Sequence, residues 1–160
     1  MSKRFSLAAV LAVVIGVAGA SLAYAGDSAD GESTQTIHLV AKTVQETELD
    51  LGKEGFGQGD QFVFADDLFR DGKKVGDDGG FCTAVRVGPG ESATFQCVVT
   101  LSLEKGQITV QGLFTSAGEA DQSPFVVAIT GGTGAYRTAR GEVKVQTDAD
   151  EDRLTVKLVS

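Results

Sequence analysis

The sequence predicts an all-β protein in which eight antiparallel strands close into a barrel behind an N-terminal signal peptide. Three features support this prediction: stretches where apolar and polar residues alternate, glycine-containing turns between them, and a basic, then apolar, then small-residue order at the N-terminus. Alternation with a period of two places one face of each strand against a core. Beyond the N-terminal segment, no apolar stripe at helical spacing persists for three turns.

The alternation is clearest in residues 95–103, where every second residue is apolar and the residues between are mostly polar. Turns such as Asp71-Gly72 and Pro89-Gly90 separate the extended stretches, so neighbours in sequence should pair as hairpins. The eight expected strands cover residues 36–44, 60–69, 74–87, 93–103, 107–115, 124–130, 135–147 and 153–159. Closure into a barrel removes the bare edges of a flat sheet, and a two-sheet sandwich is the alternative.

The N-terminus has the three parts of a secretory signal peptide. Lys3 and Arg4 are followed by an apolar run over residues 7–22 and by the sequence Ala-Tyr-Ala at 23–25. A membrane anchor is the alternative, but the run is short for a span and ends in small residues. We expect a signal peptide over residues 1–25, a flexible leader over 26–35, a barrel domain over 36–160, and a secreted or extracytoplasmic location.

Charge and composition restrict the partners. The chain carries a formal charge of −8, and loss of Lys3 and Arg4 with the signal peptide would change it to −10. An acidic domain without a basic cluster repels phosphate backbones, so we expect no nucleic-acid partner. No second apolar stretch approaches membrane-spanning length, so we expect no membrane contact after cleavage. With two cysteines and one histidine, His38, the sequence predicts no metal site.

The two cysteines, Cys82 and Cys97, flank the expected Pro89-Gly90 turn. Counting outward from that turn on a hairpin without a bulge places them directly opposite each other. Opposed residues have Cβ atoms about 4.5–5.5 Å apart, which is close to disulfide distance. Export favours oxidation, so we expect a disulfide; two free buried thiols, or a register shifted by a bulge, are the alternatives.

Acidic residues offer the simplest chemistry. The pairs Asp66-Asp67 and Asp77-Asp78 could include an acid with a raised pKa, although such pairs more often lie in solvated loops. Aspartates at positions 148, 150 and 152 have the spacing of a calcium loop, but the rest of an EF-hand pattern is missing and a solvated turn is favoured.

The expected seventh strand has an unusual polar face. Tyr136, Thr138, Arg140 and Glu142 share one side by alternation. If that side points into a barrel, it lines a cavity with a phenol, a hydroxyl and a guanidinium, and the buried guanidinium needs a carboxylate or a ligand oxygen. If it points outward, it is a solvated wall.

Residues 131–141, GGTGAYRTARG, closely resemble the GGTG-x-[FY]-R-x-A-R-G signature of dirigent proteins and of the related allene oxide cyclase barrel family. Further pieces are similar to the same family: GDQFVF at 59–64, GFC at 80–82, and GQI at 106–108 with Gly112. The resemblance implies an eight-stranded antiparallel barrel with a ligand cavity, acting without cofactor, and often a homo-oligomer, since plant members are frequently trimers.

The resemblance also implies a function. Plant dirigents steer the coupling of reactive intermediates, and the cyclases close a reactive epoxide, both by positioning. We therefore expect a barrel that binds a small apolar organic molecule and could steer its cyclisation or coupling, as a cofactor-independent isomerase or cyclase. A non-catalytic ligand carrier or extracellular structural module is the alternative. The expected ligand-binding residues are Tyr136, Thr138, Arg140, Phe62, Phe64 and Phe114.

Overall fold

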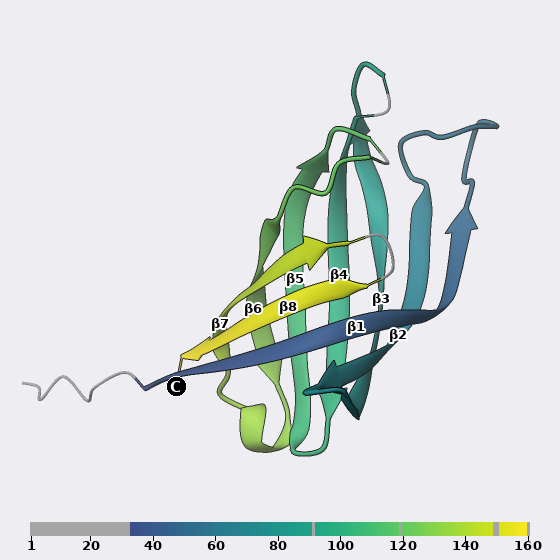
Figure 1. Cartoon of the computed structure of the whole chain (residues 1–160). Coiled ribbons are helices and arrows are strands. Elements are labelled where there is room, and N and C mark those ends of the chain that lie inside the picture. Colours follow the sequence, from purple (N-terminus) through teal and green to yellow (C-terminus); the bar gives the residue numbers. More distant parts are fainter. Residues whose placement is uncertain (1–32, 91, 119, 149–150, 160) are drawn as a thin grey trace, which may run out of the picture. The chain divides into compact units, whose positions relative to one another are not determined.

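In the computed structural model, residues 33–90, 92–118, 120–148 and 151–159 are described, and they form a closed antiparallel β-barrel (Figure 1). The expected signal peptide and most of the expected leader lie outside the described residues. The elements are β1 (Thr34–Leu49), β2 (Gln61–Arg70), β3 (Lys73–Val87), β4 (Ala93–Leu103), β5 (Gly106–Ser116), β6 (Phe125–Gly132), η1 (Gly134–Tyr136), β7 (Arg140–Thr147) and β8 (Asp152–Val159).

Each strand pairs with the next in sequence, and β8 pairs with β1 to close the barrel. The predicted barrel is therefore confirmed, and the sandwich alternative is wrong. Tight turns join β2 to β3 and β4 to β5 at the end of the barrel that also holds η1, and we name this the turn end. The longer connection over residues 50–60 lies at the opposite end, the loop end, together with the described parts of the β3–β4 and β5–β6 connections; the turn end is at the bottom of Figure 1.

The segment between β6 and β7 departs from the prediction. Residues 135–139, expected as strand, form η1 and a following turn, because Gly134 adopts a φ of 59° that turns the chain. This segment folds over the β4–β5 turn: the amide of Ala135 donates to the Lys105 carbonyl, and the Gln107 amide donates to the Thr133 hydroxyl. β7 consequently begins at Arg140 rather than at Ala135.

Alternating aliphatic side chains fill the barrel. Those of β1, β7 and β8 are among the most buried, including Ile37, Val143 and Val156. Ala41, Leu68 and Leu101 extend this core across β1, β2 and β4. No helix of the described residues is long and apolar enough to span a membrane.

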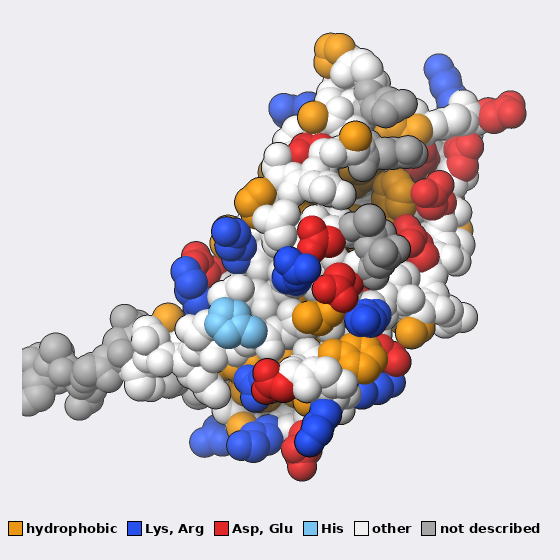
Figure 2. All heavy atoms as spheres, viewed as in Figure 1, with side chains coloured by type: hydrophobic (Ala, Val, Ile, Leu, Met, Phe, Trp, Pro, Cys, Tyr) orange, Lys and Arg blue, Asp and Glu red, His pale blue; other side chains and the backbone are white. Residues whose placement is uncertain are grey.

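Charge is unevenly spread over the surface. Figure 2 shows acidic side chains gathered over the upper part of β1 and the loop that follows, where Glu46, Glu48, Asp50 and Glu54 are exposed. Lys and Arg side chains predominate at the turn end, at the bottom of the same view. The two ends of the barrel therefore present opposite electrostatic surroundings to a ligand.

Substitution of Gly141 by alanine should destabilise the barrel by about 2 kcal/mol, because two constraints act on this residue. Its φ of 129° is one that side chains rarely adopt, and a Cβ would collide with the backbone oxygen of Lys157 on β8. Gly79→Ala is the matched control, since its Cβ would meet only ordinary contact at 3.5 Å from the Phe64 oxygen. Urea denaturation of both variants measures the difference, and equal midpoints would contradict the proposed strain.

Candidate functional site

A small cavity lies inside the barrel toward the loop end. Its volume is about 80 Å³, and its walls are mainly aliphatic. Against this apolar background it contains three carboxyl groups, from Asp66 on β2, Asp78 on β3 and Asp152 on β8. Carboxyl groups inside a folded core are rare unless they are paired or perform chemistry, so these three define the candidate site.

Asp66 and Asp78 form a facing pair. They are direct partners in the β2–β3 register, and their side chains are only 6% and 7% exposed. In this position the two carboxyls can share a hydrogen bond when one of them is protonated, and this interaction is one of the causes that raise the pKa of Asp78. Within the described part of the chain, the Oδ1 atom of each has no hydrogen-bond partner. Each residue therefore has one buried oxygen that lacks a partner, and a polar group of a ligand in the cavity would satisfy it.

The surroundings hold a proton on this cluster near neutral pH. Burial, the negative charge of Asp66 and a hydrogen bond with Asp66 together raise the pKa of Asp78 to about 8, and burial is the largest of these causes. Burial also raises the pKa of Asp152, although a hydrogen bond from Thr147 opposes the change. A carboxylic acid that is still protonated at neutral pH can donate a proton, as general acids do.

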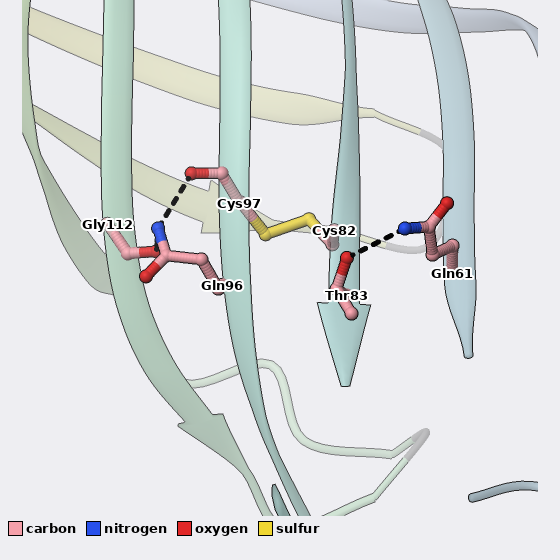
Figure 3. The surroundings of a disulfide bond; sticks show 6 residues. All are labelled: Gln61, Cys82, Thr83, Gln96, Cys97 and Gly112. Carbon is pink, nitrogen blue, oxygen red and sulfur yellow. Dashed lines mark hydrogen bonds between the residues drawn. A yellow bond between two sulfur atoms is a disulfide. The ribbon is translucent and has the colours of Figure 1, made fainter. Parts of the chain in front are cut away.

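The Cys82–Cys97 disulfide lines the same cavity. It links β3 to β4 and is shown with its neighbours in Figure 3. The expected pairing is confirmed, with a Cα–Cα distance of 4.0 Å. The expected bulge-free hairpin is wrong, however: Gly88 pairs with Ser92 across the turn, and an irregularity between Ala84 and Arg86 restores the register. The two displacements cancel, so the cysteines still face each other.

A row of phenylalanine rings leads from the loop end to the cavity. The rings of Phe114 and Phe125 are stacked, 3.9 Å apart at an angle of 11°. Phe95 contacts Phe114 at 5.8 Å and Phe62 at 5.6 Å, and Phe56 in the β1–β2 loop extends the row. Phe125 also lines the cavity itself. Half-buried rings of this kind offer flat surfaces to a planar ligand.

The structure separates the six ligand-binding residues expected from the sequence. Phe64 lines the acidic cavity, and Phe62 and Phe114 belong to the phenylalanine row. Tyr136 and Thr138 instead line a different cavity, at the turn end.

Arg140 does not point into the barrel as expected. Gly141, Val143 and Val145 occupy the inward positions of β7, so the alternation places Arg140 on the outer wall, where its side chain is exposed. Glu142, which the alternation places on the same face as Arg140, is also on the outer wall and pairs with Lys157 at 2.9 Å. The inward placement of the polar face was therefore wrong, and the carboxyl groups of Asp66, Asp78 and Asp152 occupy the interior instead.

The comparisons with known proteins agree with this architecture. Residues 36–159 match the allene oxide cyclase barrel like domain. The chain belongs to the allene oxide cyclase barrel-like family. The matched residues run from β1 to the end of β8 and therefore include all eight strands of the barrel.

Among solved structures, the chain is similar to one named pyocyanin demethylase, with 37% identity and a TM-score of 0.67, covering 77% of this chain and 99% of that one. It shares its fold with the Diels Alderase AbmU from Streptomyces koyangensis, at 12% identity, a TM-score of 0.63, and coverage of 82% and 70%. It also shares it with a nonspecific heme-binding cyclase that catalyses [4 + 2] cycloaddition, at 15% identity, a TM-score of 0.66, and coverage of 82% and 66%. A search of curated proteins found no significant match.

Proposed function

We propose that this barrel binds a small, planar organic molecule at the loop end and moves a proton to or from it through the Asp66–Asp78 pair. The observation that carries the proposal is a pair of facing carboxyl groups, buried in an aliphatic cavity, with one unpartnered oxygen on each residue in the described structure. Such a pair costs folding free energy and offers complementary proton-donating and proton-accepting atoms.

The dimensions suggest how a ligand would lie. A volume of about 80 Å³ accommodates only the reacting end of a ligand, because sites for whole drug-sized molecules are several times larger. The rest of the molecule would lie among the rings of Phe62, Phe95 and Phe114, which approach the cavity from the loop end. A flat, largely apolar molecule suits that passage.

The chemistry follows from the protonation of the pair. Asp78, protonated near neutral pH, donates to an oxygen or nitrogen of the ligand, while the carboxylate of Asp66 accepts a proton from another atom. Moving hydrogen between two positions of one molecule is isomerisation, and the same acid can assist a ring closure. We propose that this activity lies outside the cytoplasm, because residues 1–25 have the sequence pattern of a signal peptide.

The 37% identity to the structure named pyocyanin demethylase makes pyocyanin the first ligand to test. The cycloaddition enzymes share only the fold, at 12% and 15% identity, and a shared fold does not determine the reaction of this chain. Dirigent-type coupling and cyclisation stay predictions. A ligand carrier without turnover is the second candidate, because the phenylalanine row alone would bind a flat molecule.

The test replaces single carboxyl groups. In Asp78→Asn, conversion of pyocyanin should fall by about a hundredfold or more, because the amide cannot donate a proton as the acid does. Product formation is measured by liquid chromatography, which separates isomers, followed by absorbance and mass detection. Binding is measured by equilibrium dialysis, with the free pyocyanin determined from its absorbance. Activity of the unmodified protein should also fall as the pH rises through about 8, where Asp78 loses its proton.

Asp77→Asn is the matched control, because Asp77 is the neighbouring residue and its side chain is 63% exposed beside Lys74. Full activity in Asp78→Asn would refute the proposed acid. Binding without any conversion by the unmodified protein would favour the carrier, and Phe114→Ala should then weaken binding while Asp78→Asn leaves it unchanged.

A further inference from the structure

The turn end of the barrel contains a second and larger cavity, with a volume of about 590 Å³. A layer of aliphatic side chains separates it from the acidic cavity. Leu68, Ile108, Ile129 and Val156 form this layer, are at most 6% exposed, and line neither cavity. The barrel therefore holds two chambers that open at opposite ends, and a ligand in one does not reach the other.

The floor of the larger cavity is apolar. Ile37, Leu39 and Leu158 are at most 5% exposed, and all three line it. Half-buried Val75 and Leu103 pack against the same core and form the sides. The volume falls within the range that holds a drug-sized organic molecule. Binding of an apolar group against this floor is favourable because apolar surface is removed from water.

The rim of the cavity is basic. Arg70, Lys74 and Lys105 line it, and Glu104 is the acidic residue beside them. The connections that close this end, residues 70–74, 104–105 and 133–140, contain six basic and two acidic side chains, a net charge of +4 on a chain of −8. Figure 2 shows this predominance of Lys and Arg at the turn end.

Two of the rim cations are available to a ligand. Lys74 is engaged by Asp67 and Asp77, each at 2.6 Å, and these contacts hold its pKa above the usual value. In the described part of the chain, by contrast, neither Arg70 nor Lys105 contacts a carboxylate. An acidic protein that gathers unpaired cations around an apolar hollow provides local attraction for an anion.

We propose that this cavity binds an amphipathic organic anion, distinct from the ligand of the acidic cavity. Its apolar body would lie on Ile37, Leu39 and Leu158, and its carboxylate would lie between Arg70 and Lys105. Arginine and lysine suit this role because both donate charge-assisted hydrogen bonds to such oxygens. The acidic loop end repels the same anion, so charge alone directs it to the turn end.

The experiment compares two fluorescent probes of similar shape. 8-Anilinonaphthalene-1-sulfonate carries a negative charge, and N-phenyl-1-naphthylamine is neutral. In the double variant Arg70→Glu/Lys105→Glu, the dissociation constant of the anionic probe should rise about tenfold or more, while that of the neutral probe changes less than about twofold. Lys53→Glu, in the β1–β2 loop at the other end, adds half as much negative charge away from the cavity and should change neither dissociation constant.

Ala139→Trp blocks the cavity without changing charge, because Ala139 lines it from the segment after η1. The dissociation constants of both probes should rise about tenfold or more in Ala139→Trp, whereas that of the anionic probe should stay unchanged in Asp78→Asn. Circular dichroism establishes that each variant is folded. Equal loss in Lys53→Glu, or undiminished binding of the anionic probe in Ala139→Trp, would overturn the proposal.

Displacement of the anionic probe then separates two sources of such an anion. Dodecanoate represents aliphatic acids, and 2-naphthoate represents aromatic ones. Displacement by either acid, lost in the double variant, supports the site and assigns its class. If neither acid displaces the probe from the unmodified protein, the site does not bind organic carboxylates and the proposal fails.

Discussion

The free energy of unfolding should fall as the pH rises from about 4 to about 8, by about 1 kcal/mol for each pH unit, and Asp78→Asn should lose most of this dependence. The sign follows from the direction of the pKa shift. In the folded protein the pKa of Asp78 is raised from 3.8 to about 8, so between these values the folded chain retains a proton that the unfolded chain has released. The contribution of Asp78 to the free energy of unfolding is fully present below about pH 4 and is lost as the pH rises through about 8.

Urea denaturation at pH 5, 7 and 9 measures the effect. Asp77→Asn serves as control because Lys74 lowers the pKa of Asp77, so this group changes protonation only below the tested range. The difference between Asp78→Asn and the unmodified protein should grow with pH, whereas that between Asp77→Asn and the unmodified protein should stay constant. A pH-independent difference for Asp78→Asn would show that its carboxyl is not protonated in the folded state.

Because it lacks the group whose stabilising proton is lost, Asp78→Asn should be more stable than the unmodified protein at alkaline pH, and this gain bears on function. Burial and the charge of Asp66 make an ionised Asp78 unfavourable in this cavity, and an amide or aliphatic residue would avoid that cost. Sites that lower stability in this way are characteristic of binding and catalysis, where a strained or desolvated group is part of the mechanism. A variant that becomes more stable and less active would link the two properties in one residue.

Most of the barrel could be predicted from the sequence because its signals are local. Period-two alternation and glycine turns identified all eight strands, and the hairpin order follows from short connections. The start of β7 was missed because η1 depends on a contact distant in sequence, between Ala135 and the Lys105 carbonyl. The error had a consequence: treating residues 135–147 as one strand made Tyr136 and Arg140 appear to share an inward face.

The candidate site was only partly predictable. Alternation places Asp66 on the same face as Phe62, Phe64 and Leu68, a signal that was present but was read as a possible surface pair. Its partner could not be found by counting. From the Asp71-Gly72 turn, a regular hairpin would pair Asp66 with Asp77, but an irregularity next to Leu68 shifts the register by one residue and brings Asp78 opposite.

Removal of the Cys82–Cys97 disulfide should lower the free energy of unfolding by about 3 kcal/mol, the expected entropic contribution for a bridge that closes a loop of this length. The two cysteines are 15 residues apart in sequence. Loss of the bridge increases the conformational entropy of the unfolded chain, whereas the β3–β4 strand pairing still forms in the folded state. For a domain of this size the midpoint of thermal unfolding should fall by about 10 °C. Calorimetry of Cys82→Ser/Cys97→Ser measures the change.

The matched control for this variant is Thr83→Ser, one residue from Cys82 on the outer wall, where Thr83 accepts a hydrogen bond from Gln61 Nε2 at 3.1 Å (Figure 3). Alkylation of the unreduced protein should add no mass to either cysteine. Because the bridge also lines the acidic cavity, its loss should alter pyocyanin binding as well as stability, whereas Thr83→Ser should alter neither. An unchanged midpoint in the double variant would mean that the β3–β4 hairpin already restricts the unfolded chain, and that the disulfide's contribution lies in the shape of the cavity.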